Sequence, residues 1–266
     1  MPLKPNVVSA LFHRDLLITR SYRFAFALDA FYGVLDLLLY FFISRTFEHN
    51  PASLGDAPSY FAFAAVGVIL GAVLTATSTG VGYWVREEQV TGTLETVSCE
   101  PVTSFELCVG LVAFPFGFAA LRACLYLGVA AGFLHLDVSN TSWIGVVLIL
   151  LASGAAIAPI GILAGAAALA VKRGQMLSAT LMSLMAILSG MLFPISELPD
   201  WLEPLGKILP LRFAFDGARS ALFTGSGWGM DLLVLLVWAA VLWPLALYLF
   251  GRAFSFSKRA GSLAQY

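Results

Sequence analysis

The chain has 266 residues, of which 59% are hydrophobic and 12% are charged. A water-soluble domain carries roughly 25% charged residues, so this composition excludes a soluble protein and predicts an integral membrane protein. The apolar blocks are long enough to cross about 30 Å of hydrocarbon as helices. This excludes a membrane β-barrel, which needs short alternating segments. Lys and Arg number 15 and Asp and Glu 16, a balance that excludes a nucleic-acid surface.

Six apolar blocks predict an all-α bundle of six transmembrane helices. The predicted spans are 26–44, 60–84, 105–134, 143–171, 175–194 and 230–250. We treat the chain as a single membrane domain, 1–266. Its parts are an interfacial helix (1–25), spans one to five (26–194), outer re-entrant helices (195–229), span six (230–254) and a tail (255–266).

The positions of the basic residues predict the orientation. Six crossings put both chain ends on one side, where ten Lys and Arg fall against four on the other, so the positive-inside rule makes both ends cytoplasmic. The ten are Lys4, Arg14, Arg20, Arg23, Arg86, Lys172, Arg173, Arg252, Lys258 and Arg259, the four are Arg45, Lys207, Arg212 and Arg219, and Arg122 lies inside a span.

Residues 1–25 carry apolar side chains at helical spacing opposite a basic face. This pattern is typical of a helix that lies in the headgroup layer, although a plain cytoplasmic tail is an alternative. The apolar positions are Val8, Leu11, Phe12, Ile18 and Tyr22, and the basic ones are Arg14, Arg20 and Arg23.

The segment 86–101, between spans two and three, is the most polar stretch of the chain. Gly92 interrupts its first turn, Thr93 can cap a new helix, and Pro101 ends it. A short cytoplasmic helix of this kind offers a docking site for a partner. The alternative is an ordinary solvated connector.

The segment 192–229 is punctuated by Pro194, Pro199, Pro204 and Pro210. It is too short for two more crossings and too apolar to float free, so we expect a pair of re-entrant or interfacial helices. A simple outer loop is the alternative.

These two polar segments resemble the signatures of the type-2 ATP-binding-cassette (ABC) transporter permeases, which are the membrane halves of type V exporters. The first resembles the family's coupling helix at Arg86, Glu87, Glu88, Gly92, Thr93, Leu94, Glu95 and Pro101. The second resembles the outer signature at Phe193, Pro194, Leu198, Pro199, Trp201, Pro210, Asp216, Arg219 and Gly225. The family includes exporters of drugs, lipo-oligosaccharides and polysaccharides.

The resemblance implies a bacterial inner-membrane permease that dimerises with a second copy or a paralogue. Two nucleotide-binding subunits would dock on its coupling helices, and the outer residues would form an extracellular gate. Because the chain has no GxxxxGK[ST] loop, ATP and Mg²⁺ are expected to bind to the partner ATPase. We expect no catalytic residue and no metal site, since His13, His49 and His135 are isolated. The substrate would be an amphipathic drug, lipid, glycolipid or lipid-linked glycan.

The first span carries a polar stripe at helical spacing, formed by Asp29, Tyr32, Gly33, Asp36 and Tyr40. Charged groups at membrane depth usually face a cavity or a partner. Two interpretations remain open and are compatible: the stripe lines the substrate path, or Asp36 pairs with Arg122 of span three at similar depth. An ion- or proton-coupled secondary transporter that uses Asp29 and Asp36 is the alternative function.

The predicted orientation can be tested with single cysteines in a cysteine-free background. Asp200→Cys should react with an impermeant thiol reagent in intact cells, and Thr91→Cys should react only after permeabilisation. Labelling of Thr91→Cys from outside would overturn the arrangement.

Overall fold

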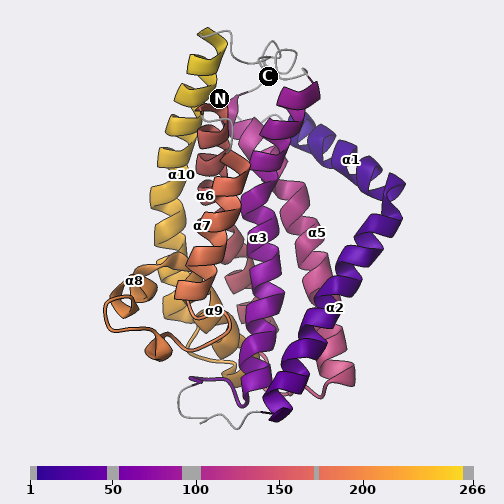
Figure 1. Ribbon diagram of the computed structural model, residues 1–266, viewed down its shortest axis with the longest axis vertical. Coiled ribbons are helices and arrows are strands. Elements are labelled where there is room, and N and C mark those ends of the chain that lie inside the picture. The colour runs from indigo at the N-terminus through magenta and orange to yellow at the C-terminus, as the bar shows by residue number, and fades with distance from the viewer. Residues whose placement is uncertain (1–4, 47–53, 92–102, 171–173, 260–266) are drawn as a thin grey trace.

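The computed structural model describes residues 5–46, 54–91, 103–170 and 174–259, and this part of the chain contains helices and no strand (Figure 1). The prediction of an all-helical protein is confirmed. The long helices are α1 (Pro5–Ser21), α2 (Arg23–Thr46), α3 (Tyr60–Thr91), α5 (Ser104–Phe133), α6 (Trp143–Ala170), α7 (Gly174–Leu188) and α10 (Gly229–Arg259). The short elements are the 3-10 helix η2 (Ile195–Glu197), α8 (Glu203–Ile208), α9 (Pro210–Arg219) and the π-helix η3 (Ser220–Thr224).

Within the described ranges, five helices are long and apolar enough to cross a membrane, and each overlaps a predicted span. Their apolar stretches are Ala27–Thr46, Tyr60–Val85, Phe105–Phe133, Trp143–Ala167 and Gly229–Phe256. The boundaries lie within a few residues of the prediction, except that the last span reaches Phe256. The start of α5 is fixed by a capping box, in which the Thr103 hydroxyl accepts from the Glu106 N–H and the Glu106 carboxylate accepts from the Thr103 N–H.

The predicted fifth span, 175–194, is shorter in the structure. Its helix α7 has 15 residues, a length of about 22 Å at 1.5 Å per residue. The helix ends at Leu188 because Gly190 takes a left-handed conformation with φ of 77°, which turns the chain away before Pro194. The last residues of the predicted span therefore belong to the irregular outer segment.

Helix α3 is the centre of the bundle. Its most apolar stretch is 78% buried, against 6% for that of α2. Helix α6 lies close against α3 at Gly161, where a Cβ atom would be only 2.2 Å from the Ser78 carbonyl oxygen. Helix α10 packs against α6, and the Trp243 indole N–H of α10 donates a hydrogen bond of 2.9 Å to the Ala155 carbonyl of α6.

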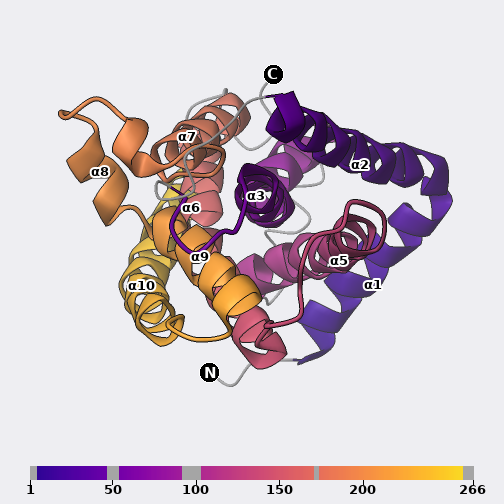
Figure 2. The same ribbon diagram turned by 90° about the horizontal axis from the view of Figure 1, so that it is seen from below.

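The last turns of α3 and the short helices α8 and α9 lie toward opposite ends of the bundle (Figure 1). We call the end where α1, the last turns of α3 and the last turns of α10 lie the α1 end. Helices α8 and α9 lie toward the opposite end, which we call the α9 end. Seen from that end, α9 crosses over α6 between α10 and α3 (Figure 2). The expected pair of short helices in 195–229 is thus present as α8 and α9.

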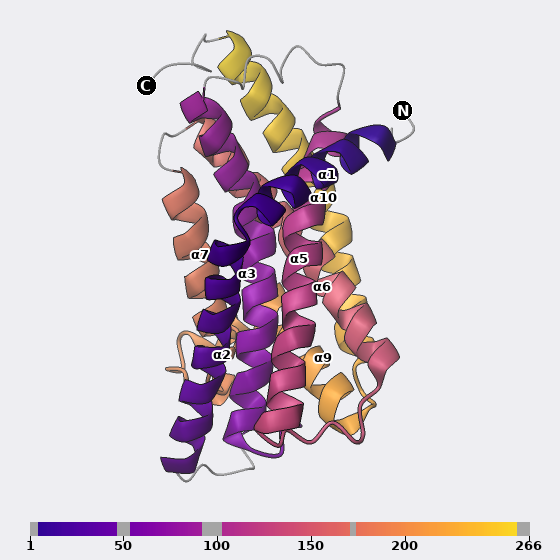
Figure 3. The same cartoon turned by 90° about the vertical axis from the view of Figure 1, so that its right-hand side faces the viewer.

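Helix α1 lies at a steep angle to the bundle and packs on α5 (Figure 3). The rings of Phe12 and Phe114 meet edge to face with centroids 5.3 Å apart. A Cβ atom at Gly110 would lie 2.5 Å from Leu11 Cδ1, so the absence of a side chain at this position lets α1 pack closely against α5. The structure confirms a separate amino-terminal helix, and its location in the headgroup layer stays a prediction.

Candidate functional site

The polar stripe of α2 faces a cavity of about 490 Å³ between α2, α3 and α5, which we call the stripe cavity. All five stripe residues line it. Its polar lining from the other helices consists of Thr75 and Thr79 of α3 and Arg122 and Tyr126 of α5. The structure therefore brings together every residue that the sequence analysis placed on the candidate path.

Arg122 forms an ion pair with Asp29 and not with Asp36. The pairing of Asp36 with Arg122 predicted from depth along the spans is therefore wrong. The register of α2 and α5 is set where Tyr126 packs on Gly33, with the Tyr126 hydroxyl 3.5 Å from the Asp29 carbonyl oxygen. Asp29 and Arg122 each lie one turn before this contact, whereas Asp36 lies about 10 Å farther along α2 than Asp29.

A second cavity of about 590 Å³, which we call the α1 cavity, lies between α1, α3 and α5. The charged residues that line it are Arg14 and Asp15 of α1, Glu87 of α3 and Arg122 of α5. The two cavities share Ala76 and Arg122 as lining residues, so they adjoin at the ion pair. The sequence analysis missed this cavity, because the basic face of α1 was read only as a membrane surface. Phe114 and Phe118 of α5 line it, and their rings stack with centroids 5.8 Å apart.

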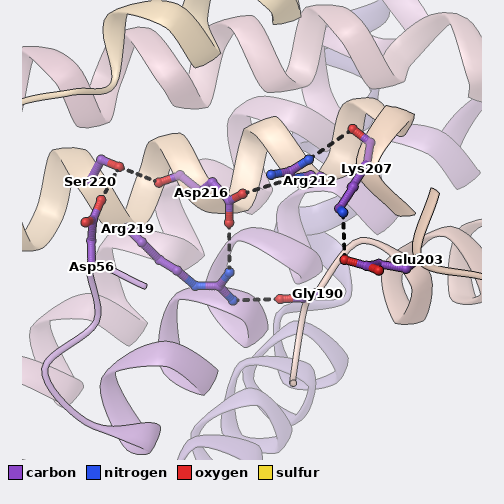
Figure 4. Close-up of polar contacts among 8 residues, drawn as sticks. All are labelled: Asp56, Gly190, Glu203, Lys207, Arg212, Asp216, Arg219 and Ser220. Carbon is purple, nitrogen blue, oxygen red and sulfur yellow. Dashed lines mark hydrogen bonds and ion pairs between the residues drawn. The ribbon is translucent and has the colours of Figure 1, made fainter. Parts of the chain in front are cut away.

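At the α9 end, Arg219 is the central polar residue, with only 3% of its surface exposed (Figure 4). Its Nη2 donates to the carbonyls of Phe63, Gly190 and Met191 at 3.3, 2.9 and 3.1 Å. Its guanidinium also lies 3.5 Å from the centroid of the Phe63 ring. A single side chain thereby connects α9 with the start of α3 and with the turn that follows α7.

Asp216 lies at the centre of a chain of charged groups on α9. Its carboxylate is 3.5 Å from Arg219 Nη1 and 3.2 Å from Arg212 Nε. Burial lowers the pKa of Arg219 to about 10, and Asp216 opposes this effect, so Arg219 stays protonated at neutral pH. The sequence analysis missed Asp56, whose Oδ2 lies 2.6 Å from the Ser220 hydroxyl. No local pattern marks Asp56, since its partner is 164 residues away.

Gly225 ends the π-helix η3 with φ of 68°, a left-handed conformation that favours glycine. A Cβ atom there would also lie 2.5 Å from the Asn140 carbonyl oxygen. This close approach lets Thr141 donate to the Leu222 carbonyl at 2.8 Å. The outer signature is thereby attached to the loop between α5 and α6.

The remaining outer residues shape the chain between α7 and α9. Pro194 precedes η2, Pro210 is the first residue of α9, and Trp201 is 74% exposed. Phe193 and Leu198 are half-buried, and Pro199 accepts the Leu202 N–H at 2.8 Å. None of these residues is among the hydrogen-bond partners of Arg219, and Pro210 shares only its helix. Their role as a gate stays a prediction.

Only some of the predicted coupling residues lie among the residues that the structure describes. Arg86, Glu87 and Glu88 belong to the last two turns of α3, which reaches Thr91 at the α1 end. Gly92, Thr93, Leu94, Glu95 and Pro101 lie outside the described residues. Among the described residues, no group of His, Cys, Asp and Glu side chains is arranged to hold a metal ion.

Comparison with known proteins gives two findings. Residues 7–223 match the family model of the ABC-2 type transporter. The chain is also similar to Nodulation protein J of Sinorhizobium fredii (strain NBRC 101917 / NGR234), with 27% identity over 181 residues, which cover 66% of this chain and 67% of that protein. The family match extends from α1 into η3 and includes the segment 86–101 and residues 192–223 of the outer segment.

The ion pair can be tested with a double-mutant cycle on thermal stability in detergent. Asp29→Asn leaves Arg122 without its partner, and we expect a loss of about 1–2 kcal/mol, because Asp29 is partly exposed. Adding Arg122→Gln should recover part of this loss. Asp36→Asn is the matched control and should not lower stability. Strictly additive effects of the Asp29 and Arg122 changes would contradict the pairing.

The Arg219 network predicts a strong difference between two conservative changes. Arg219→Lys cannot satisfy three carbonyls and the Asp216 carboxylate together, so it should lower the free energy of unfolding by roughly 2–4 kcal/mol. Arg212→Lys, at a more exposed pair on the same helix, should cost less than about 1 kcal/mol. Equal melting temperatures for the two variants would show that the Arg219 contacts contribute little.

Proposed function

Because the chain belongs to the ABC-2 type transporter family, it is a non-catalytic membrane permease subunit of an ABC exporter, and we propose that it moves an amphipathic substrate out of the cytoplasm or the inner leaflet. ATP is used by a partner nucleotide-binding subunit, as the family implies. The substrate class is a drug, lipid, glycolipid or lipid-linked glycan. We assign no substrate from Nodulation protein J, because 27% identity supports a common family and does not identify the transported molecule.

The orientation that fits best has the α1 end in the cytoplasm of a bacterial inner membrane. Helix α6 runs toward the α1 end and α10 starts from the α9 end (Figure 1). The chain between them must return across the bundle, so α7 with its following turn serves as the short fifth of six crossings. An even number of crossings puts both chain ends on the same side, and the excess of Lys and Arg on that side, ten against four, makes it cytoplasmic. The α1 helix then lies in the cytoplasmic headgroup layer.

The observation that carries the proposal is that the α1 cavity and the stripe cavity adjoin along α3. The α1 cavity is lined by Glu87, a residue of the proposed coupling segment, and adjoins the stripe cavity at Arg122. A substrate headgroup would enter at the α1 end and continue through the stripe cavity. The outer segment around Pro194, Trp201 and Pro210 would close the far side as a gate.

The proposed mechanism is a population shift of a permease dimer. Two ATPase subunits, which close when they bind ATP, would contact Arg86, Glu87, Glu88, Gly92, Thr93, Leu94, Glu95 and Pro101. Closure would favour the outward-open state, and a shift from 1:99 to 99:1 needs about 5.5 kcal/mol of differential binding. The second permease is a further copy or a paralogue. The secondary-transporter alternative has no support, because membership of an ABC family assigns the energy source to ATP.

The coupling segment can be tested in the assembled exporter with Gly92→Val and Glu95→Lys. Each change should abolish substrate-stimulated ATPase activity and transport, because the first fills the proposed contact and the second reverses its charge. The complex should still insert in the membrane. Asp137→Asn, in the loop between α5 and α6, is the control and should retain both activities. Unchanged coupling in both variants would contradict the proposed docking site.

A further inference from the structure

Asp36 is a carboxylate without a counter-charge in the stripe cavity. Asp29 is neutralised by Arg122, whereas Asp36 has neither a hydrogen bond nor an ion pair among the described residues. The lining contains two carboxylates and one basic side chain, so the cavity has a net charge of −1. An uncompensated charge at membrane depth is costly and is normally matched by a partner.

A second copy of this chain does not supply the missing charge at the right depth. The basic residues within the five apolar spans are Arg45, Arg122 and Arg252. Arg45 lies at the end of α2, over the Phe41 ring, and Arg252 lies near the opposite end of the bundle, bonded to the Tyr248 hydroxyl. Arg122 is the remaining one, and it is already paired.

The surroundings of Asp36 suit an organic cation. Tyr32 and Tyr40 lie one turn before and one turn after it on the same face of α2 and line the same cavity. The negative faces of such rings attract ammonium-like groups. From α3, the Thr79 hydroxyl donates its proton to the Thr75 carbonyl at 2.9 Å, so its oxygen offers the cavity only lone pairs. At about 490 Å³ the cavity has room for a bulky cation.

We propose that the stripe cavity binds the cationic group of an amphipathic substrate, with the Asp36 carboxylate as counter-ion and the rings of Tyr32 and Tyr40 beside it. This inference rests on the proposed function, in which the cavity is part of the export path. It selects amines and onium compounds within the broad class of amphipathic substrates. Anionic headgroups would be disfavoured at Asp36.

Two probes of nearly the same shape and opposite charge test the proposal: tetraphenylphosphonium and tetraphenylborate. Binding is measured by equilibrium dialysis on the full permease in nanodiscs of zwitterionic lipid, with empty nanodiscs subtracted. The wild type should prefer the cation, and Asp36→Asn should weaken cation binding by about tenfold without weakening anion binding. Asp36→Glu should keep the preference.

Two further variants separate charge recognition from structural damage. Tyr32→Leu changes a largely exposed side chain and should weaken cation binding a fewfold without altering the melting temperature. Asp137→Asn removes an exposed carboxylate outside the cavity and should change nothing. If Asp36→Asn fails to fold, the Tyr32→Leu result decides: unchanged cation binding in that variant counts against the site.

Three results would overturn the inference. The first is equal binding of the two probes to the wild type, which would mean that the cavity does not select by charge. The second is unchanged cation binding in Asp36→Asn. The third is loss of the permease dimer in Asp36→Asn with cation binding intact, which would mean that a partner subunit neutralises Asp36. Each leaves the proposed exporter function standing, because that is tested separately by Gly92→Val.

Discussion

The guanidinium of Arg219 satisfies backbone carbonyls where the helical pattern is interrupted. Irregular backbone near membrane depth is tolerated only if its polar groups find partners within the protein, and the turn after α7 exposes the carbonyls of Gly190 and Met191. A single buried arginine donates to both and to Phe63 as well. The short α7, the turn that follows it and the position of α9 over α6 all depend on this contact.

A second constraint acts between α2 and α5. The two helices are held in register where the Tyr126 ring occupies the space left open by Gly33, and this register decides which aspartate meets Arg122. Asp29 is neutralised and Asp36 is left facing the cavity. A shift of two turns would exchange their roles, so the charge of the cavity is a consequence of one packing contact between an aromatic ring and a glycine.

The sequence predicted the features that depend on local pattern and failed for those that depend on distant contacts. Apolar length located five spans, helical spacing gathered the α2 stripe on one face, and prolines marked the short outer helices. Depth along the chain did not give the partner of Arg122, because helices that start at different levels cannot be aligned by counting residues. The length of α7 was overestimated because Gly190 was not recognised as the helix end. Asp56 and the α1 cavity were missed because their surroundings come from segments far apart in the chain.

Helix α3 lacks a feature that three of the other long spans share. Proline interrupts α5 at Pro115, α6 at Pro159 and α10 at Pro244, whereas the 32 residues of α3 contain none. Its hydrogen-bonded backbone is continuous for about 42 Å from Phe63, beside Arg219, to Thr91, within the proposed coupling segment. An unbroken helix resists bending. A tilt of α3 about the contact of Ser78 with Gly161 would therefore move Thr91 and Phe63 in opposite directions.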